Sequence, residues 1–311
     1  MRQLVWSTLA SLIVVSTLPA QTRTLAERLG HPRDAKLLIL HADDLGVAHS
    51  ENAASFDALD KGAINSGSVM MPTPWVTEVA QYAKAHPNAD LGLHLTLNSE
   101  WRTYRWGGLA PRDQTPSLHD PDGTFPPEVS TMTKRARVDE VEKELRAQID
   151  RAYAIGLKPT HVDSHMGALY ETPELFKTYA KVARSYKLPF LHFIERPSPE
   201  IVATLAPSDV VADAVIMRLQ NGSPAEWRQY YLNAIRTLKP GLTVILVHLG
   251  YDDAELRAVT VGWDDWGAAW RQRDYDVLTS AELRRALTDN KVVLVTWRDV
   301  RRVMYRGMAN P

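Results

Sequence analysis

The stretch Lys36–Gly46, KLLILHADDLG, decides the fold of this chain. Its four consecutive apolar residues, 37–40, are typical of a strand that is buried on both faces of a parallel sheet. Asp43 and Asp44 follow closely, and Gly46 permits a turn that a side chain would obstruct. Because ligand-binding and catalytic groups of α/β proteins collect at the carboxyl ends of parallel strands, this stretch predicts a functional site at the strand end.

The two adjacent carboxylates need a physical explanation. At a buried strand end they repel each other and lose hydration, which is costly unless a cation or a shifted pKa compensates. Alternatively, one of them caps the next helix and the other faces water, because Asp is a favoured capping residue. Two histidine motifs further along the chain favour the first explanation.

Apolar runs alternate with amphipathic segments along the chain from residue 36 onward. The expected strands are Leu37–His41, Ser68–Met71, Leu91–Leu95, Thr160–Asp163, Phe190–Ile194, Val210–Met217, Thr243–His248 and Val292–Thr296. The expected helices are Glu51–Lys61, Trp75–Ala85, Val138–Ile155, Pro173–Lys187, Ala225–Leu238 and Ala281–Asp289. This alternation predicts a single α/β domain shaped like a TIM-type β/α barrel, and it does not determine whether the barrel is regular or fully closed. An open doubly wound sheet is the alternative.

The composition is that of an ordinary globular protein. Hydrophobic residues make up 45% of the 311, which is enough for a sizeable core. The formal net charge of −1 indicates no general attraction to nucleic acid or to an anionic membrane. There is no cysteine, so disulfides are excluded and any metal site must use histidines and carboxylates.

The amino-terminal segment is typical of a secretory signal peptide. Arg2 precedes the mostly apolar stretch Leu4–Leu18, and Pro19 and Ala20 follow it. A retained membrane anchor stays open as an alternative, because Leu18 is not the small residue preferred before a cleavage site. We expect export to the periplasm or the exterior without stable membrane association after cleavage. The expected parts are a signal peptide over 1–20, a polar lead-in over 21–35 and a catalytic domain over 36–311.

Two further motifs contain histidines. The segment LGLHLTL places His94 inside an expected strand, where a histidine among leucines is more often a core residue than a ligand. The segment LKPTHVDSHMG supplies His161, Asp163 and His165 at alternate positions. All three would project from one face if the strand continued that far, whereas an earlier turn would redirect one of them.

The combination of motifs points to a metal site. Asp44, His94 and His165 each lie near the carboxyl end of a different expected strand, where a barrel would bring them together. Two imidazoles and one carboxylate leave open coordination positions on a divalent ion, as a hydrolytic site requires. The remaining carboxylate, Asp43, would then accept a proton from the attacking water.

Four motifs in this order, HADDLG, GLHLTL, THVDSHMG and VHLGYDD, resemble the YdjC/ChbG family of carbohydrate deacetylases. The likeness runs over most of the chain after residue 36. It implies a β/α-barrel-like fold, a divalent metal ion and hydrolysis of an acetamido group on a sugar. Carried over position by position, it makes Asp44, His94 and His165 the metal ligands and Asp43 the general base.

The chain departs from the family pattern at three places. His41 stands where asparagine is frequent, and its imidazole would either compete for metal or only form hydrogen bonds. Met166 and Gly167 stand where many members carry further histidines, and Leu249 stands where proline is frequent. The last two departures leave the proposed ligands intact but leave the shape of the sugar pocket open.

Supporting roles are expected for several other residues. His248 ends the apolar run Thr243–Val247 and suits a general acid that protonates the departing amine, with a backbone-bonded histidine as the alternative. His41, His161 and Asp163 are expected to support the metal ligands through hydrogen bonds.

The segment Asn98–Ser130 is long and shows no helical pattern, so we expect an insertion that covers the site. Trp101 and Trp106 lie in it and are candidates for stacking on sugar rings, with core filling as the alternative. Arg273, in an expected polar turn near the carboxyl end, either orients the substrate or pairs at the surface.

Together these features predict an exported hydrolase that uses one divalent ion, zinc or magnesium, to remove the acetyl group from an N-acetylated sugar or oligosaccharide. The alternatives are a metal-dependent phosphoesterase, a deacylase of non-sugar amides, or a non-catalytic carbohydrate-binding protein. A basic cluster at the pocket would favour phosphate, and a neutral aromatic pocket would favour sugar. The sequence does not determine the oligomeric state.

Overall fold

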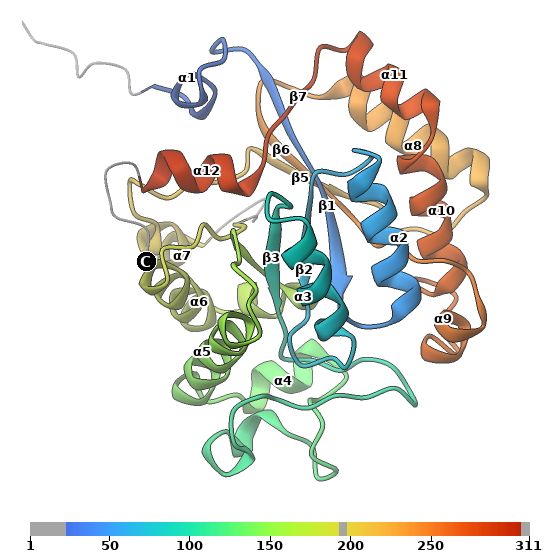
Figure 1. Ribbon diagram of the computed structural model, residues 1–311. Coiled ribbons are helices and arrows are strands. Elements are labelled where there is room, and N and C mark those ends of the chain that lie inside the picture. The colour runs from blue at the N-terminus through green and yellow to red at the C-terminus, as the bar shows by residue number, and fades with distance from the viewer. Residues whose placement is uncertain (1–22, 193–197, 306–311) are drawn as a thin grey trace, which may run out of the picture.

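The computed structural model describes residues 23–192 and 198–305, and its centre is one parallel sheet (Figure 1). The strand order is β4-β3-β2-β1-β6-β5, and β7 pairs with the start of β1. All of these pairings are parallel, as predicted. The strands are β1 Lys36–Leu45, β2 Ser66–Val69, β3 Leu91–Leu95, β4 Val162–Ser164, β5 Ala214–Met217, β6 Gly241–Val247 and β7 Val293–Leu294.

The sheet curls into a half-barrel. Its two ends are β5 and, beyond β4, a single bridge between Phe190 and Val162. Within the described ranges no ladder joins these two ends, so the barrel is incomplete there. The predicted barrel-like single α/β domain is confirmed. The expected strand Phe190–Ile194 shrinks to that one bridge in its described part, and the expected signal peptide, 1–20, lies outside the described residues.

Helices pack around the sheet (Figure 1). The six expected helices are present, with ends within two residues of those predicted. None of the helices in the described part of the chain combines the length and apolar character that crossing a membrane requires. The helices are α1 Leu25–Leu29, α2 His49–Asp60, α3 Val76–Ala85, α4 Val129–Arg135, α5 Val138–Ala154, α6 Pro173–Ser185, α7 Pro199–Thr204, α8 Pro224–Thr237, α9 Ala254–Val259, α10 Ala268–Leu278, α11 Ala281–Asp289 and α12 Trp297–Met304, with short 3-10 segments at Arg112–Gln114, Pro116–Leu118 and His165–Tyr170.

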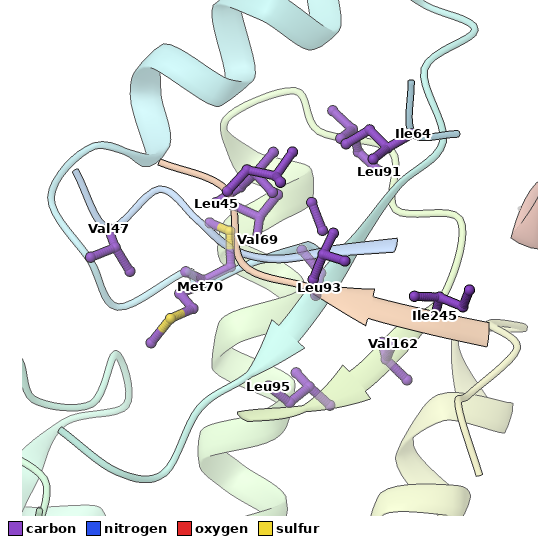
Figure 2. Close-up of a cluster of buried hydrophobic side chains, with 14 of the residues drawn as sticks. Leu45, Val47, Ile64, Val69, Met70, Leu91, Leu93, Leu95, Val162 and Ile245 are labelled. Carbon is purple, nitrogen blue, oxygen red and sulfur yellow. The ribbon is translucent and has the colours of Figure 1, made fainter. Parts of the chain in front are cut away.

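Strand β1 is buried on both faces, as its apolar run predicts. Leu37 and Ile39 pack into one buried cluster, whereas Leu38 and Leu40 pack into a larger cluster on the other face. Figure 2 shows part of the larger cluster, which joins side chains from five strands of the sheet. This double burial holds β1 at the centre of the sheet, so the residues at its carboxyl end have a fixed position.

The segment 98–130 lies beyond the carboxyl ends of the strands (Figure 1). Trp101 and Trp106 in this segment are only 2% and 5% exposed, and their rings pack edge to face. The indole N–H of Trp106 donates a hydrogen bond to the carbonyl of Asn98 at 2.8 Å. Trp101 reaches the cavity described below, but Trp106 is not among its lining residues. The structure therefore places Trp106 in the core, which is the alternative to stacking on a sugar ring.

Replacing Trp106 with alanine should lower the free energy of unfolding by about 3–5 kcal/mol, because it leaves a large cavity under the segment. Leu109, in the same segment and 36% exposed, is a matched control whose change to alanine should cost about 0.5 kcal/mol or less. Urea unfolding of both variants measures the difference. Equal small losses would show that Trp106 does not anchor the segment.

Candidate active site

Asp43 and Asp44 face the same cavity because β1 is irregular at this point. The pairing of β1 with β2 shifts register between Ala42 and Leu45, and Asp44 has a left-handed backbone with φ of 67°. Adjacent side chains of a regular strand point to opposite faces, so this irregularity lets both carboxylates line one cavity. Strain of this kind in a non-glycine residue is concentrated at functional sites.

Asp44, His94 and His165 converge at the carboxyl ends of β1, β3 and β4. Oδ1 of Asp44 lies 3.4 Å from Nε2 of His94 and 3.4 Å from Nδ1 of His165. All three residues are buried, and their ligand atoms are close enough to share one ion. Among the described residues Oδ1 of Asp44 has no hydrogen-bond partner, which is costly for a buried carboxylate unless a cation binds it.

Hydrogen bonds on the far side of each imidazole leave the near nitrogen free. Nδ1 of His94 lies 2.7 Å from Asp163, and Nε2 of His165 lies 3.0 Å from Glu100, a residue that the sequence did not single out. Each carboxylate accepts a ring N–H, so in the neutral imidazole the nitrogen that faces Asp44 is the one that carries the lone pair. The 3.4 Å separations match two ligands about 2.1 Å from one tetrahedral ion. The donor set therefore fits a divalent metal ion.

Asp163 links this triad to a deeper layer of histidines. It is the direct partner of His94 across the β3–β4 ladder, and its second oxygen lies 2.9 Å from Nε2 of His41. Nδ1 of His41 lies 3.0 Å from the hydroxyl of Ser66, and His161 packs edge-on against the His41 ring. His41, His161 and Asp163 are also close enough to share an ion. Because both nitrogens of His41 are used in hydrogen bonds, these three residues fit a supporting role better than a second metal site.

The ionisable groups of the triad shift one another's pKa values. Burial opposes a charge on His165, but the carboxylates of Glu100 and Asp44 outweigh it and raise the pKa of His165 to about 10. Burial would raise the pKa of Asp44, but Arg271, His165 and His248 hold it well below its usual range. Asp44 is therefore ionised at neutral pH, and an ion that binds here would displace a proton from His165.

Arg271 on α10 is the main site residue that the sequence analysis missed. It is 2% exposed, donates to Oδ2 of Asp44 at 2.8 Å, and lies 2.8 Å from a carboxylate oxygen of Glu51. The predicted Arg273 instead donates to Asn221 and does not line the cavity. Two residues along a helix correspond to a rotation of about 200°, so Arg273 faces away when Arg271 faces the site. Arg271 could be predicted as a site residue only after α10 is recognised as a helix.

His248 faces the two aspartates from the end of β6. Its Nε2 lies 3.9 Å from Oδ2 of Asp43 and 3.9 Å from Oδ2 of Asp44. Its backbone N–H donates to Asp274 at 3.0 Å, and Trp266 packs edge-on against its ring. Burial is the largest cause that lowers the pKa of His248 to about 4, so the imidazole is neutral at neutral pH.

These groups line one cavity of about 690 Å³. Trp101, Trp263 and Trp266 contribute aromatic surface to it, and aliphatic residues also line it. Among the described lining residues, Arg271 is the sole lysine or arginine, and it is already paired with Asp44 and Glu51. The cavity therefore presents a candidate metal-binding triad, a carboxylate and a neutral imidazole. None of these lining residues supplies an unpaired lysine or arginine.

Comparison with known proteins gives concordant matches. A family model described as YdjC-like protein matches residues 37–289. A carbohydrate deacetylase of Thermus thermophilus is 34% identical over 301 residues, covering 90% of this chain and 99% of that protein. A chitooligosaccharide deacetylase of Yersinia pestis is 30% identical over 157 residues, covering 50% of this chain and 58% of that protein. The crystal structure of an Enterococcus faecalis protein named for cellobiose-phosphate cleavage has the same fold, with a TM-score of 0.73, 24% identity and coverage of 86% of this chain and 99% of that one.

Replacing Asp163 with asparagine should lower the affinity for a divalent ion by about 10–100-fold, because a neutral amide orients His94 less firmly than a carboxylate. Asp139→Asn, at a side chain that is 57% exposed on α5, is the matched control and should bind metal as the parent does. Competition with a chelating dye measures both affinities. Identical affinities in the two variants would show that Asp163 does not position the ligand.

Proposed function

Since the chain belongs to the family of YdjC-like proteins, we propose that it is a metal-dependent deacetylase that removes the acetyl group from an N-acetylated sugar or oligosaccharide. The resemblance carried by the four motifs is confirmed by the family match over residues 37–289. The observation that carries the proposal is the convergence of Asp44, His94 and His165 beside Asp43 and His248. Relatives named carbohydrate deacetylase, aligned over nearly their whole length, support an acetylated carbohydrate as the substrate.

The residues that would hold the metal are Asp44, His94 and His165, through Oδ1, Nε2 and Nδ1 respectively. A divalent ion supplies Lewis acidity there, which polarises a carbonyl and makes water a better nucleophile. Two imidazoles with one carboxylate favour zinc or another transition ion, since magnesium prefers oxygen ligands. Loading the metal-free protein with each ion in turn would identify which one it uses.

Asp43 is placed to accept the proton of the attacking water. Its Oδ1 lies 3.3 Å from the hydroxyl of Ser68 and 3.2 Å from Nε2 of His41, and these contacts fix the carboxylate. Its Oδ2 faces His248 across 3.9 Å. A carboxylate held in this way can act as the general base while the water oxygen attacks the acetyl carbon.

His248 would donate a proton to the departing amine. Because its pKa is about 4, the imidazole begins neutral and must gain a proton before it can give one. Asp43 is a nearby source, and closing the gap of 3.9 Å by about 1 Å would create a hydrogen bond. The proton taken from water would then reach the amine nitrogen as the C–N bond breaks, leaving acetate and a free amino sugar.

Two alternatives fit the cavity less well. A phosphoesterase would use a free cation to bind its substrate, and the one arginine among the described lining residues is paired with Asp44 and Glu51. A non-catalytic carbohydrate-binding protein would have no use for a base and an acid beside a metal-binding triad. Three tryptophans in the lining also favour a sugar ring.

The two aspartates should behave differently on substitution. Asp43→Asn removes the base but no ligand, so we expect it to retain metal and to lose on the order of 10²–10⁴ in kcat. Asp44→Asn removes charge from the ligand set, so metal affinity itself should fall and added metal should restore part of the turnover. Elemental analysis and acetate release from an N-acetylated chitooligosaccharide, with and without a chelator, measure both effects.

Three results would contradict the assignment. Loss of the ion in Asp43→Asn with retention in Asp44→Asn would mean that the two roles are exchanged. Full metal content and full activity in both variants would mean that neither carboxylate takes part. Acetate release that a strong chelator leaves unchanged in the parent protein would contradict metal dependence.

We also propose that the protein is exported to the periplasm or the exterior. The basic Arg2, the apolar stretch Leu4–Leu18 and the small Ala20 support this. When the whole chain is expressed in a bacterium with two membranes, amino-terminal sequencing of the periplasmic fraction should begin at Gln21. Recovery of a chain starting at Met1 in the cytoplasm or the membrane would contradict export with cleavage.

A further inference from the structure

The cavity is lined by two chemically different sets of residues. The polar set contains the metal-binding triad, Asp43, His248 and Arg271. The aliphatic part of the lining, which we call the aliphatic wall, contains Met166, Leu191, Met217, Leu219 and Leu246. A hydroxyl-rich ligand would find hydrogen-bond partners among the polar residues. The aliphatic wall offers it none and therefore needs a separate explanation.

The aliphatic wall spans the open seam of the half-barrel. Leu191 follows the bridge at Phe190, at one end of the sheet, whereas Met217 belongs to β5 at the other end. Leu246 lies on β6, next to β5. The wall is therefore assembled from both edges of the sheet, where a closed barrel would place strand pairing instead of cavity surface.

Hydroxyl groups next to the aliphatic wall are already used. Two tyrosines line the cavity next to the wall, Tyr170 and Tyr230. The hydroxyl of Tyr170 donates to the carbonyl of Leu191 at 2.9 Å, and that of Tyr230 donates to the carbonyl of Met217 at 2.8 Å. Both donors thus fix the backbone of the wall, so neither proton is available to a sugar hydroxyl.

Two wall residues leave apolar surface in water at the mouth of the cavity. Leu219 is 66% exposed and Met166 is 44% exposed. Met166 also has a left-handed backbone with φ of 53°, a conformation that is unfavourable for a residue with a side chain. Exposed apolar side chains gathered at a concave site, one of them held under strain, are typical of a surface that a ligand covers.

The wall lies on the amine side of the reaction centre. Leu246 precedes His248 by two residues at the end of β6, and both line the cavity. In the proposed reaction His248 gives its proton to the amine nitrogen, which stays attached to the sugar. A group that contacts Leu246 would therefore lie beside the general acid, on the side of the sugar that keeps the amine.

We infer that the aliphatic wall binds an apolar group linked to the sugar, so that the substrate is an N-acetylated sugar carrying an alkyl or aryl group at its glycosidic position. This inference rests on the proposed deacetylase function and narrows its substrate class. Trp263 and Trp266 in the same cavity supply ring surface for the sugar itself.

The test compares acetate release from the methyl and the hexyl β-glycosides of N-acetylglucosamine by the metal-loaded protein. Burial of each methylene contributes about fourfold, so partial burial of the longer chain should raise kcat/KM by on the order of tenfold or more. Leu219→Ser should reduce the hexyl-to-methyl ratio of kcat/KM by about threefold or more. Val202→Ser, at a 50% exposed position on α7 outside the cavity lining, is the control and should keep the parent's ratio.

The outcomes separate this inference from the proposed function. If both glycosides are deacetylated with equal kcat/KM, the apolar-group inference is overturned while the deacetylase proposal stands. If neither releases acetate, calorimetry with hexyl and methyl β-glucosides, which lack the acetamido group, decides the inference independently. Tighter binding of the hexyl compound that Leu219→Ser weakens supports the wall as a binding surface, and equal binding overturns it.

Discussion

The buried pair between Arg271 and Asp44 is the interaction on which the site depends. The irregular end of β1 places two buried carboxylates in one cavity, and Glu51 adds a third close by. Arg271 neutralises part of this charge and occupies Oδ2 of Asp44, so Oδ1 is left to face the two imidazoles. Burial, with help from neighbouring carboxylates, raises the pKa of Glu51 to about 8. Glu51 is then largely neutral at pH 7, which leaves Arg271 mainly to Asp44.

The two imidazoles of the triad are oriented by carboxylates from different parts of the chain. Asp163 orients His94 from the next strand of the sheet, whereas Glu100 orients His165 from the segment 98–130. That segment therefore contributes residues to the site. Trp106 does not line the cavity, yet its ring centre lies 6.4 Å from that of His165, so the packing of this segment is coupled to the position of a candidate metal ligand.

Sequence reasoning found the residues whose positions follow from the strands. Asp43, Asp44 and His94 sit at or near the ends of apolar runs, and the ends of parallel strands meet at one edge of a sheet. Arg271 could not be found in this way, because α10 has charged residues buried among its apolar ones and shows no single apolar face. Glu100 lies in a segment without periodicity. The irregularity of β1 that directs both aspartates into one cavity could not be predicted from the alternation of residue types. It depends on the pairing of β1 with β2.

The incomplete closure of the barrel accounts for the size of the cavity. A closed eight-stranded barrel fills its centre with side chains, which leaves little room for a ligand inside. Here β5 ends the described sheet as an edge strand, and each of its four residues is only partly buried. The candidate metal-binding triad comes from β1, from β3 and from the turn that follows β4, whereas β5 lies at the opposite end of the described sheet. An apolar edge strand that is only partly buried invites non-specific association. The presence of such an edge strand beside the reaction centre is therefore explained if a ligand covers this surface during catalysis.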